Sequence, residues 1–242
     1  MPAFLVLFMW STSYSQYKTL AESPMFKNGK DNYFQDTADK KIYSLAHMDS
    51  LFKTGKSPFE VITASSVGDS MLWQIRFISE MPTIRPRWIH QPFPLPELMD
   101  MNGKKVDSVA LKGKIWIINC WSISCGPCIK EMPYLNRLVD SLDNLQFAFL
   151  GITFDKPDEI KDFFNSDKLK KYLGTPKPEF KFTLIADQEN FLTHILGVIN
   201  YPTTFIVDRT GIVKEVMEGV NLDESQNPKV YDEITLCLKG IR

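Results

Sequence analysis

The sequence lacks a marked excess of charge. Its 28 Lys and Arg residues nearly balance its 29 Asp and Glu residues, and no long run of one sign occurs. The missing basic excess argues against nucleic acid as a partner, and the missing charge runs argue against a polyelectrolyte partner. Internal repeats and low-complexity tracts are absent too, which excludes repeat architectures. With 242 residues, 44% of them hydrophobic, the chain can build one good core and a smaller module.

Long hydrophobic runs are also missing. The apolar run 3–10 has 8 residues, whereas a membrane span needs about 20. Because small polar residues follow this run, we expect a signal peptide over residues 1–15, cleaved near Ser15, even though no basic region precedes it. The mature chain is then periplasmic or otherwise extracytoplasmic, without stable membrane insertion. No cysteine stands at the cleavage site, so we do not expect a lipoprotein.

Cysteine is scarce, with 4 residues. A structural zinc site needs about four ligands, usually from two paired motifs. Only Cys125 and Cys128 are paired in sequence, since Cys120 and Cys237 stand apart. A c-type haem requires His after the second cysteine of such a pair, and Ile129 occupies that position. We therefore expect neither a metal site nor a bound cofactor.

The paired cysteines follow a predicted strand and open a predicted helix. Residues 115–121 are apolar except for Asn119, which is typical of a strand buried on both faces. Pro127 suits the first turn of a helix, and apolar residues then recur at helical spacing. A helix N-terminus lowers a thiol pKa from about 8.5 to roughly 3.5–7.5. We therefore predict that Cys125 is the attacking thiol and Cys128 the resolving thiol of a redox-active pair.

A second motif lies further along the chain, at residues 200–208. There Tyr201-Pro202 precedes an apolar, β-branched strand, and proline at the start of a strand often marks a special turn. Together with the Cys-Gly-Pro-Cys sequence, this motif resembles the thioredoxin superfamily, in which a cis-proline loop faces the dithiol. The resemblance implies a disulfide between Cys125 and Cys128. It also implies a cis bond before Pro202, with Tyr201 and Pro202 binding the substrate backbone.

Three further segments narrow the resemblance. They are residues 94–105, 111–114 and 128–133. Over about residues 89–242 the chain is similar to the TlpA/ResA group of extracytoplasmic thioredoxin-like proteins. This resemblance implies that Glu131 is an acid near the thiols and that Trp121 packs beside the site and contributes to substrate binding. It also implies protein thiols and disulfides as partners, with an upstream membrane electron donor. As a catalytic residue, Glu131 would raise the thiol pKa values and relay the proton of the resolving step. A simpler hypothesis for Glu131 is a solvated first-turn acid that complements the helix dipole.

The chain departs from the family pattern at three positions. Cytoplasmic thioredoxins carry a buried acid at the position of Asn119, so proton transfer at the site is expected to differ from theirs. In the TlpA-like group, Asn is usual at this position. Ser124 stands where the family commonly has Trp, and Cys120 stands where it commonly has Phe. These two replacements leave open how a partner docks and how solvent reaches the site. Four cysteines allow two disulfides. We instead expect Cys120 and Cys237 to be free buried thiols, because each fits a small buried hydrophobe.

Two other functions compete with a thiol-disulfide oxidoreductase. A peroxiredoxin-like peroxidase carries a T-x-x-C arrangement, whereas Ser122 and Ile123 precede Cys125 here at minus three and minus two. A copper-binding chaperone would pair His194 with the cysteines. A helix-packing or surface role suits a single histidine better. The physiological substrate and the direction of electron flow stay open.

His47 and His90 lie in the segments before the main domain, and we assign them no role. Residues 16–88 are predicted to form an N-terminal α+β extension. It contains a short helix near 42–52 and a candidate hairpin that pairs 59–64 with 71–78 through the turn 67–70. Residues 57–60 also fit a helix capping box, so this stretch is compatible with the start of a helix as well. The proline-rich residues 82–96 are predicted to be a linker.

Residues 89–242 alternate between strand and helix patterns. Strands are predicted at 115–121, 146–153, 182–186, 203–208 and 212–216, and helices at 126–142, 157–173, 188–196 and 229–240. Such alternation predicts an α/β fold with a central sheet and helices on both faces. The resemblance implies that this fold is a thioredoxin-like domain with a mixed sheet. Residues 209–211 predict a hairpin turn, so the last two strands are expected to be antiparallel.

Overall fold

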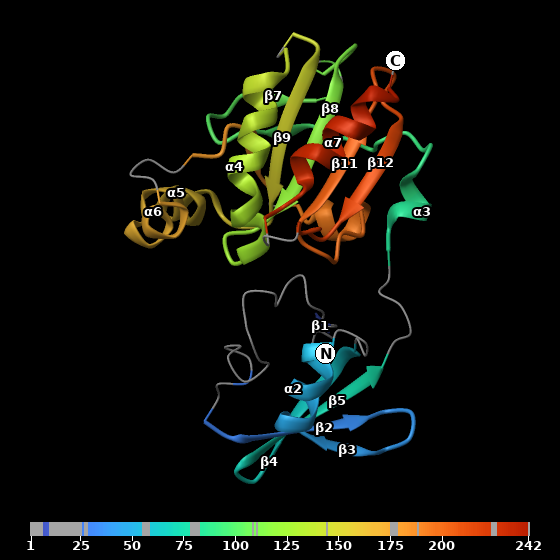
Figure 1. Cartoon of the computed structure of the whole chain (residues 1–242), viewed down its shortest axis with the longest axis vertical. Helices are drawn as coiled ribbons and strands as arrows, with labels where there is room; N and C mark the ends of the chain where they lie inside the picture. Colours follow the sequence, from blue (N-terminus) through green and yellow to red (C-terminus); the bar gives the residue numbers. More distant parts are fainter. Residues whose placement is uncertain are drawn as a thin grey trace. The chain divides into compact units, whose positions relative to one another are not determined.

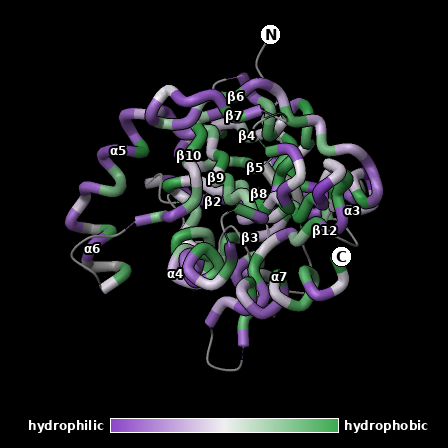
Figure 2. The backbone as a smooth tube through the Cα atoms, turned by 90° about the horizontal axis from the view of Figure 1, so that it is seen from above, coloured by the Kyte–Doolittle hydropathy of each residue, from purple (hydrophilic) through white to green (hydrophobic). Residues whose placement is uncertain are grey.

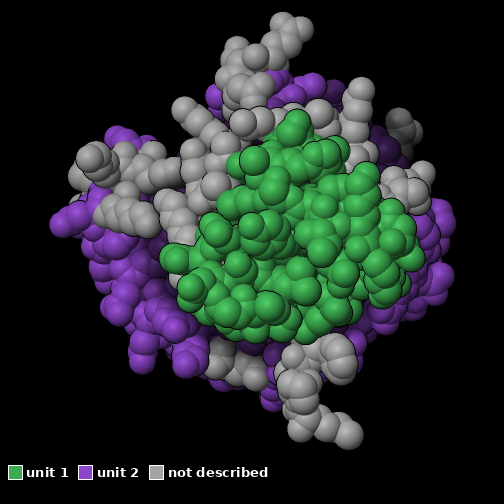
Figure 3. All heavy atoms as spheres, turned by 90° about the horizontal axis from the view of Figure 1, so that it is seen from below, with its two compact units in different colours: residues 1–82 green, residues 83–242 purple. Residues whose placement is uncertain are grey.

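The computed structural model describes residues 7–9, 26, 29–54, 59–77, 83–107, 109, 111–143, 145–174, 179–187, 189–223 and 227–241. The chain divides into two compact units, Met1–Pro82 and Thr83–Arg242 (Figure 3). This division falls before the domain boundary predicted after residue 88. The signal peptide predicted over residues 1–15 lies outside the described residues except for Leu7–Met9, which forms a strand, and it stays a prediction.

Among its described residues, the first unit contains a five-stranded sheet and the helix α2 (Figure 1). Its strands run in the order β1 (Leu7–Met9), β4 (Phe59–Val67), β5 (Ser70–Phe77), β2 (Asp31–Asp36) and β3 (Ile42–Ser44), and its helix is α2 (Leu45–Thr54). The predicted hairpin is confirmed as β4 and β5, which turn at Gly68 with a φ of 59°. The helix begins later than predicted, because residues 42–44 pair with β2 as a strand.

The proline-rich segment predicted to be a linker is instead part of the second unit from Thr83 onward. Its residues form the short helix α3 (Arg85–Trp88), and the Trp88 indole donates a hydrogen bond to the Leu196 carbonyl at 2.8 Å. Phe93 is buried and donates its amide to the Gly211 carbonyl at 2.9 Å. The linker prediction is therefore wrong for this segment, because its aromatic residues complete a core that composition alone does not reveal.

A mixed five-stranded sheet forms the centre of the second unit. Its order is β10 (Thr183–Ala186), β9 (Phe147–Thr153), β8 (Ile115–Trp121), β11 (Thr203–Val207) and β12 (Val213–Glu218). Strands β8, β9 and β10 are parallel, and β11 is antiparallel to both β8 and β12. A small ladder of β6 (Leu98–Met99) and β7 (Lys105–Val106) adjoins this sheet, because Asp100, directly after β6, bridges to Ile185 of β10. The predicted α/β fold with a mixed sheet is confirmed, as is the antiparallel final pair.

Side-chain alternation along β8 assigns the two faces of the sheet. Ile115 and Ile117 belong to the core cluster on the side of α4 (Gly126–Ser141) and α7 (Val230–Lys239), which lie together in Figure 1. Trp116 and Ile118 belong to the opposite cluster, which packs against Trp88, Phe93 and the turn η2 (Phe191–Ile195). All of β8 (Ile115–Trp121) is buried, including the polar Asn119. This pattern fits a strand buried on both faces.

Two predicted helices differ from those in the structure. The helix predicted over 157–173 is two helices, α5 (Pro157–Asn165) and α6 (Asp167–Leu173), and α5 is largely hydrophilic in Figure 2. Ser166 separates them, because its hydroxyl accepts the Leu169 amide at 3.2 Å and donates to the Phe163 carbonyl at 2.7 Å. The helix predicted over 188–196 shrinks to the π-helical turn η2, since the Asp187 carboxylate accepts the first amides of that segment.

Candidate active site

The two paired cysteines lie where β8 gives way to α4, as the sequence predicts. Cys125 is the N-cap residue of α4, and its Sγ accepts the backbone amide of Cys128 at 3.2 Å. Its carbonyl accepts the Ile129 amide at 3.1 Å, which starts the helix. The Cys125 sulfur therefore caps the N-terminus, the positive end, of a 16-residue helix.

Cys125 and Cys128 are joined by a disulfide, with an S–S distance of 2.02 Å and a Cα–Cα distance of 5.3 Å. The predicted pairing is therefore confirmed. Cys125 is 7% exposed and Cys128 is 2% exposed. A sulfur atom of a partner protein has to reach the cysteine with which it exchanges. The larger exposed fraction of Cys125 therefore favours Cys125 as the cysteine that reacts with a partner.

Asp155 fixes the loop that carries Cys125, and the sequence analysis does not identify it. One of its carboxylate oxygens accepts the Ile123 amide at 2.8 Å and the Thr153 hydroxyl at 2.5 Å. Its side chain can reach the loop because the ends of β8 and β9 are adjacent, with Trp121 opposite Thr153. Asp155 is buried, so these hydrogen bonds are shielded from water.

The Tyr201-Pro202 bond is cis, as predicted. The next residue, Thr203, pairs with Cys120 of β8, so this loop lies at the end of the sheet from which the dithiol segment departs. The Tyr201 side chain packs against the same apolar cluster as both cysteines, and the Phe154 ring lies 5.6 Å from its ring. Burial raises the pKa of the Tyr201 phenol, whose hydroxyl has no hydrogen-bond partner within the described residues. The contribution of Tyr201 and Pro202 to substrate binding stays a prediction.

Glu131 is buried in α4, three residues after Cys128, and is only 2% exposed. Residues three apart are neighbours on a helix surface, so the carboxyl group lies on the side of the helix that carries Cys128. Its Oε2 atom has no hydrogen-bond partner in the described part of the chain. Burial raises its pKa well above the ordinary value, and the nearby Glu233 carboxylate adds to the increase. The hypothesis of a solvated first-turn acid is therefore wrong.

Trp121 packs beside the site, as the family resemblance implies, and belongs to the same cluster as the dithiol. It has no exposed surface and contacts the rings of Phe163, Phe164 and Phe180, with centroids 5.9–6.0 Å away. Gly151 leaves room for this indole, because a Cβ there would lie 3.3 Å from its Nε1 atom. Since the indole is fully buried, Trp121 shapes the site through the residues packed on it.

The other two cysteines are free, as expected. Cys120 is fully buried, and burial raises its pKa, with a further contribution from Asp187. Cys237 is free but only half-buried, so the prediction of a buried thiol is met only in part at this position. His194 is exposed on η2. No group of three or more His, Cys, Asp or Glu residues is placed to hold a metal ion among the residues that the structure describes.

Comparison with known proteins gives a family match within the second unit and several similar proteins. The AhpC/TSA family model matches residues 89–216. The thiol-disulfide oxidoreductase ResA of Bacillus anthracis is 32% identical over 126 residues, which cover 52% of this chain and 66% of ResA. ResA of Bacillus thuringiensis subsp. konkukian is 31% identical with the same coverage. The chain thus spans slightly less than two thirds of these relatives.

Solved structures with similarity to the chain include two extensively covered proteins. StoA from Bacillus subtilis has a TM-score of 0.46 and 17% identity, with 62% of this chain and 98% of StoA covered. A thiol-disulfide isomerase from Corynebacterium glutamicum has a TM-score of 0.48 and 17% identity, with 63% and 96% covered. No helix among the described residues is long and apolar enough to cross a membrane.

Proposed function

The chain belongs to the AhpC/TSA family, and from that membership we propose that it is a thiol-disulfide oxidoreductase acting on cysteines of partner proteins. The observation that carries this proposal is the position of Cys125. Its sulfur caps α4 and accepts the Cys128 amide, so a negative charge on that sulfur is stabilised by the helix end. Relatives named thiol-disulfide oxidoreductase ResA support the same activity.

The reaction begins from the reduced dithiol. The Cys125 thiolate attacks one sulfur of a partner disulfide, a mixed disulfide forms, and the partner's other sulfur leaves as a thiolate that takes up a proton. Cys128 then loses its proton and attacks the Cys125 sulfur, which releases the partner's second thiolate. The partner is reduced by two electrons, and the chain ends with the Cys125–Cys128 disulfide that the structure contains.

Glu131 is proposed to accept the proton that Cys128 loses. Its pKa is raised by burial and by Glu233, in the direction of a thiol pKa. A smaller pKa difference between donor and acceptor lowers the free-energy cost of proton transfer, so the raised pKa favours transfer from Cys128. Its unpartnered Oε2 atom is free of a competing donor within the described residues.

The backbone of Tyr201 is proposed to bind the substrate as an added strand. The loop that contains it lies at the same end of the sheet as the dithiol, and an extended peptide bound there would bring its disulfide to Cys125. We also propose that the protein works outside the cytoplasm and receives electrons from a membrane donor. The predicted signal peptide and the resemblance to extracytoplasmic proteins support that location.

The test is reduction of insulin disulfides by the full chain. Cys125→Ser is expected to abolish the reaction, whereas Cys128→Ser keeps the first attack and accumulates a mixed disulfide that reductant releases. Cys237→Ser is the matched control and should react like the wild type. Full insulin reduction by Cys125→Ser would overturn the proposal. Peroxide consumption without a thiol partner would instead point to a peroxidase.

The reduction potential of the pair decides the direction of electron flow. A value near about −270 mV is typical of a reductase, and one near about −120 mV is typical of a strong oxidant. Equilibration of the Cys125–Cys128 pair with glutathione mixtures of known potential measures it.

A further inference from the structure

Phe154 is the exposed aromatic residue of the second unit. It is 46% exposed, whereas every other aromatic side chain that the structure describes in this unit is buried or half-buried. A single exposed hydrophobic residue is common on protein surfaces, so exposure alone indicates no function. Phe154, however, directly follows β9 at the dithiol end of the sheet, where Thr153 pairs with Trp121. The contacts around the ring therefore decide whether it has a role.

The backbone on both sides of Phe154 is held in place. Thr153, the last residue of β9, pairs with the neighbouring strands β8 and β10. Asp155 donates its amide to the Thr153 hydroxyl at 3.1 Å, and its carboxylate accepts the Ile123 amide at 2.8 Å. Since Ile123 stands two residues before Cys125, Phe154 is fixed relative to the loop that carries the reactive sulfur. A side chain held in this way loses little freedom when a partner binds.

The ring of Phe154 also contacts the cis-proline loop. Its centroid lies 5.6 Å from that of the Tyr201 ring, at an interplanar angle of 77°, which is an edge-to-face contact. Tyr201 itself packs against the apolar cluster that contains both cysteines. Ile199, two residues before Tyr201, adds another exposed apolar side chain to this loop. Phe154 therefore exposes apolar surface directly beside the residue whose backbone is proposed to bind the substrate.

We propose that Phe154 selects partner proteins by packing against an apolar side chain that stands close in sequence to the partner's reacting cysteine. This inference rests on the proposed exchange reaction, because the partner's cysteine must reach Cys125. An apolar side chain that docks on the ring removes part of the exposed aromatic surface from water, and burial of apolar area stabilises the complex. A hydroxyl or carboxylate at the same place would lose hydrogen bonds with water, since the ring offers no replacement.

Strand geometry indicates where this apolar residue stands in the partner. Phe154 is tied to the loop of Cys125 as well as to Tyr201, so the side chain that meets it belongs to a residue near the partner's cysteine. An extended segment advances about 3.3 Å per residue, which places residues one or two positions away about 3–7 Å from the cysteine along the strand. This range is comparable with the 5.6 Å between the two rings. We therefore expect the apolar residue one or two positions before or after the cysteine.

The test uses short peptides of Ser and Gly around one central cysteine. In four of them a single Phe stands one or two positions before or after the cysteine, and the reference peptide has no Phe. Each cysteine is joined to nitrothiobenzoate in a mixed disulfide. The Cys125 thiolate of the reduced full chain attacks the peptide sulfur, a new disulfide forms between them, and nitrothiobenzoate leaves as the thiolate because its pKa is low. The absorbance of the released thiolate measures the rate constant.

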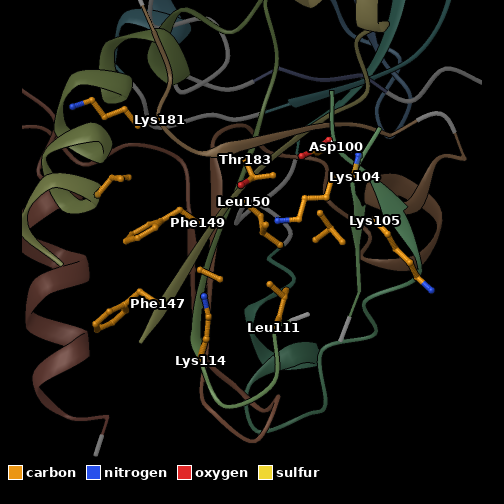
Figure 4. Close-up of a pocket in the computed structure, with 13 residues that line it drawn as sticks. Asp100, Lys104, Lys105, Leu111, Lys114, Phe147, Phe149, Leu150, Lys181 and Thr183 are labelled. Carbon is orange, nitrogen blue, oxygen red and sulfur yellow. Dashed lines mark hydrogen bonds between the residues drawn. The ribbon is translucent and has the colours of Figure 1, made fainter. Parts of the chain in front are cut away.

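At least one Phe peptide is expected to react roughly tenfold faster than the reference peptide. Phe154→Ala should reduce this preference to within about twofold, whereas Phe154→Leu keeps an apolar side chain and should retain most of it. Leu145→Ala is the matched control, because Leu145 is an 83% exposed apolar residue two positions before β9. That end of β9 lines a separate cavity (Figure 4), about 20 Å from the dithiol end, so the preference should be unchanged.

Two results would overturn this inference while the exchange reaction stands. They are equal rate constants for all five peptides with the wild type, and an undiminished preference for the Phe peptides in Phe154→Ala. A variant that merely disturbs the loop would slow all five peptides alike and keep the preference, so it gives the second of these results. Failure of every peptide to release nitrothiobenzoate would instead contradict the proposed function itself, and this inference with it. Circular dichroism confirms that each variant is folded.

Discussion

At the scale of single residues, the burial of Glu131 has a consequence for stability. Its folded-state pKa lies above the ordinary value of 4.5, mainly through burial and then through Glu233. Between that value and the raised pKa, the folded protein holds a proton that the unfolded chain has lost. Stability therefore falls as the pH rises above about 4.5, by about 1.4 kcal/mol per pH unit, until the raised pKa is reached.

Glu131→Gln removes this pH dependence, because an amide does not titrate. We expect the unfolding free energy of the variant to exceed that of the wild type by an amount that grows as the pH rises above about 4.5, with the two similar near about pH 4. Denaturant unfolding of both oxidised proteins over this range measures the difference. Glu159→Gln, in the exposed first turn of α5, is the control. A constant difference between wild type and Glu131→Gln would contradict a raised pKa.

The four cysteines are expected to differ in reactivity. Unfolding and alkylation of the oxidised protein without reductant should label Cys120 and Cys237 and leave Cys125 and Cys128 unlabelled, because only the latter pair is bonded. In the reduced, folded protein Cys125 should react first, and Cys120 should react last because it has no exposed surface and a raised pKa. Mass spectrometry of the labelled peptides measures which cysteines are labelled in the oxidised protein and in which order they react in the reduced protein. Early labelling of Cys120 would contradict its burial.

At the scale of elements, the loop between β8 and α4 depends on Asp155. Asp155→Ala leaves the Ile123 amide and the Thr153 hydroxyl without their acceptor, and we expect a loss of about 1–3 kcal/mol in unfolding free energy together with slower insulin reduction. Asp155→Asn keeps an acceptor oxygen and should lose less. Asp158→Ala, whose side chain is 93% exposed, is the control. Equal stability of Asp155→Ala and Asp158→Ala would show that the loop does not need this anchor.

The elements that the sequence predicts are those whose signal is local. The change from β8 to α4 is visible because a continuous apolar run meets Pro127 and a helical repeat. Strand β2 is missed because two of its buried residues, Asn32 and Asp36, are polar. Asn32 is satisfied there by distant groups, since its oxygen accepts the Trp73 indole N–H at 2.7 Å and its amide donates to the Phe26 carbonyl at 3.0 Å.

Within the candidate site, too, the features with a local sequence signal are predicted and those that depend on distant neighbours are missed. The roles of Cys125 and Cys128 follow from their spacing and from the helix that begins beside them. The importance of Asp155 depends on the pairing of β9 with β8, which no short segment encodes. The burial of Glu131 likewise depends on the packing of α7 beside α4, which brings Glu233 near it. A three-dimensional neighbour, unlike a motif, leaves no signal in the adjacent sequence.

At the scale of the whole molecule, the second unit includes residues upstream of the region that matches the family. The family match begins at residue 89, but the unit begins at Thr83. Arg85 forms a two-pronged ion pair with Glu215 of β12, with contacts of 2.5 and 3.0 Å. Trp88 and Phe93 add two buried aromatic side chains to its core. The segment 83–96 is therefore part of the folded unit.

Truncation tests this conclusion. A chain of residues 83–242 should unfold cooperatively and retain insulin reduction, because the core of the second unit and the dithiol are intact. A chain of residues 97–242 lacks Trp88 and Phe93, and loss of a buried aromatic side chain costs about 3–5 kcal/mol. Domains have only about 5–15 kcal/mol of stability, so losing both should leave the shorter chain largely unfolded in guanidinium titrations compared with residues 83–242. Equal midpoints for the two chains would show that the segment is a linker after all.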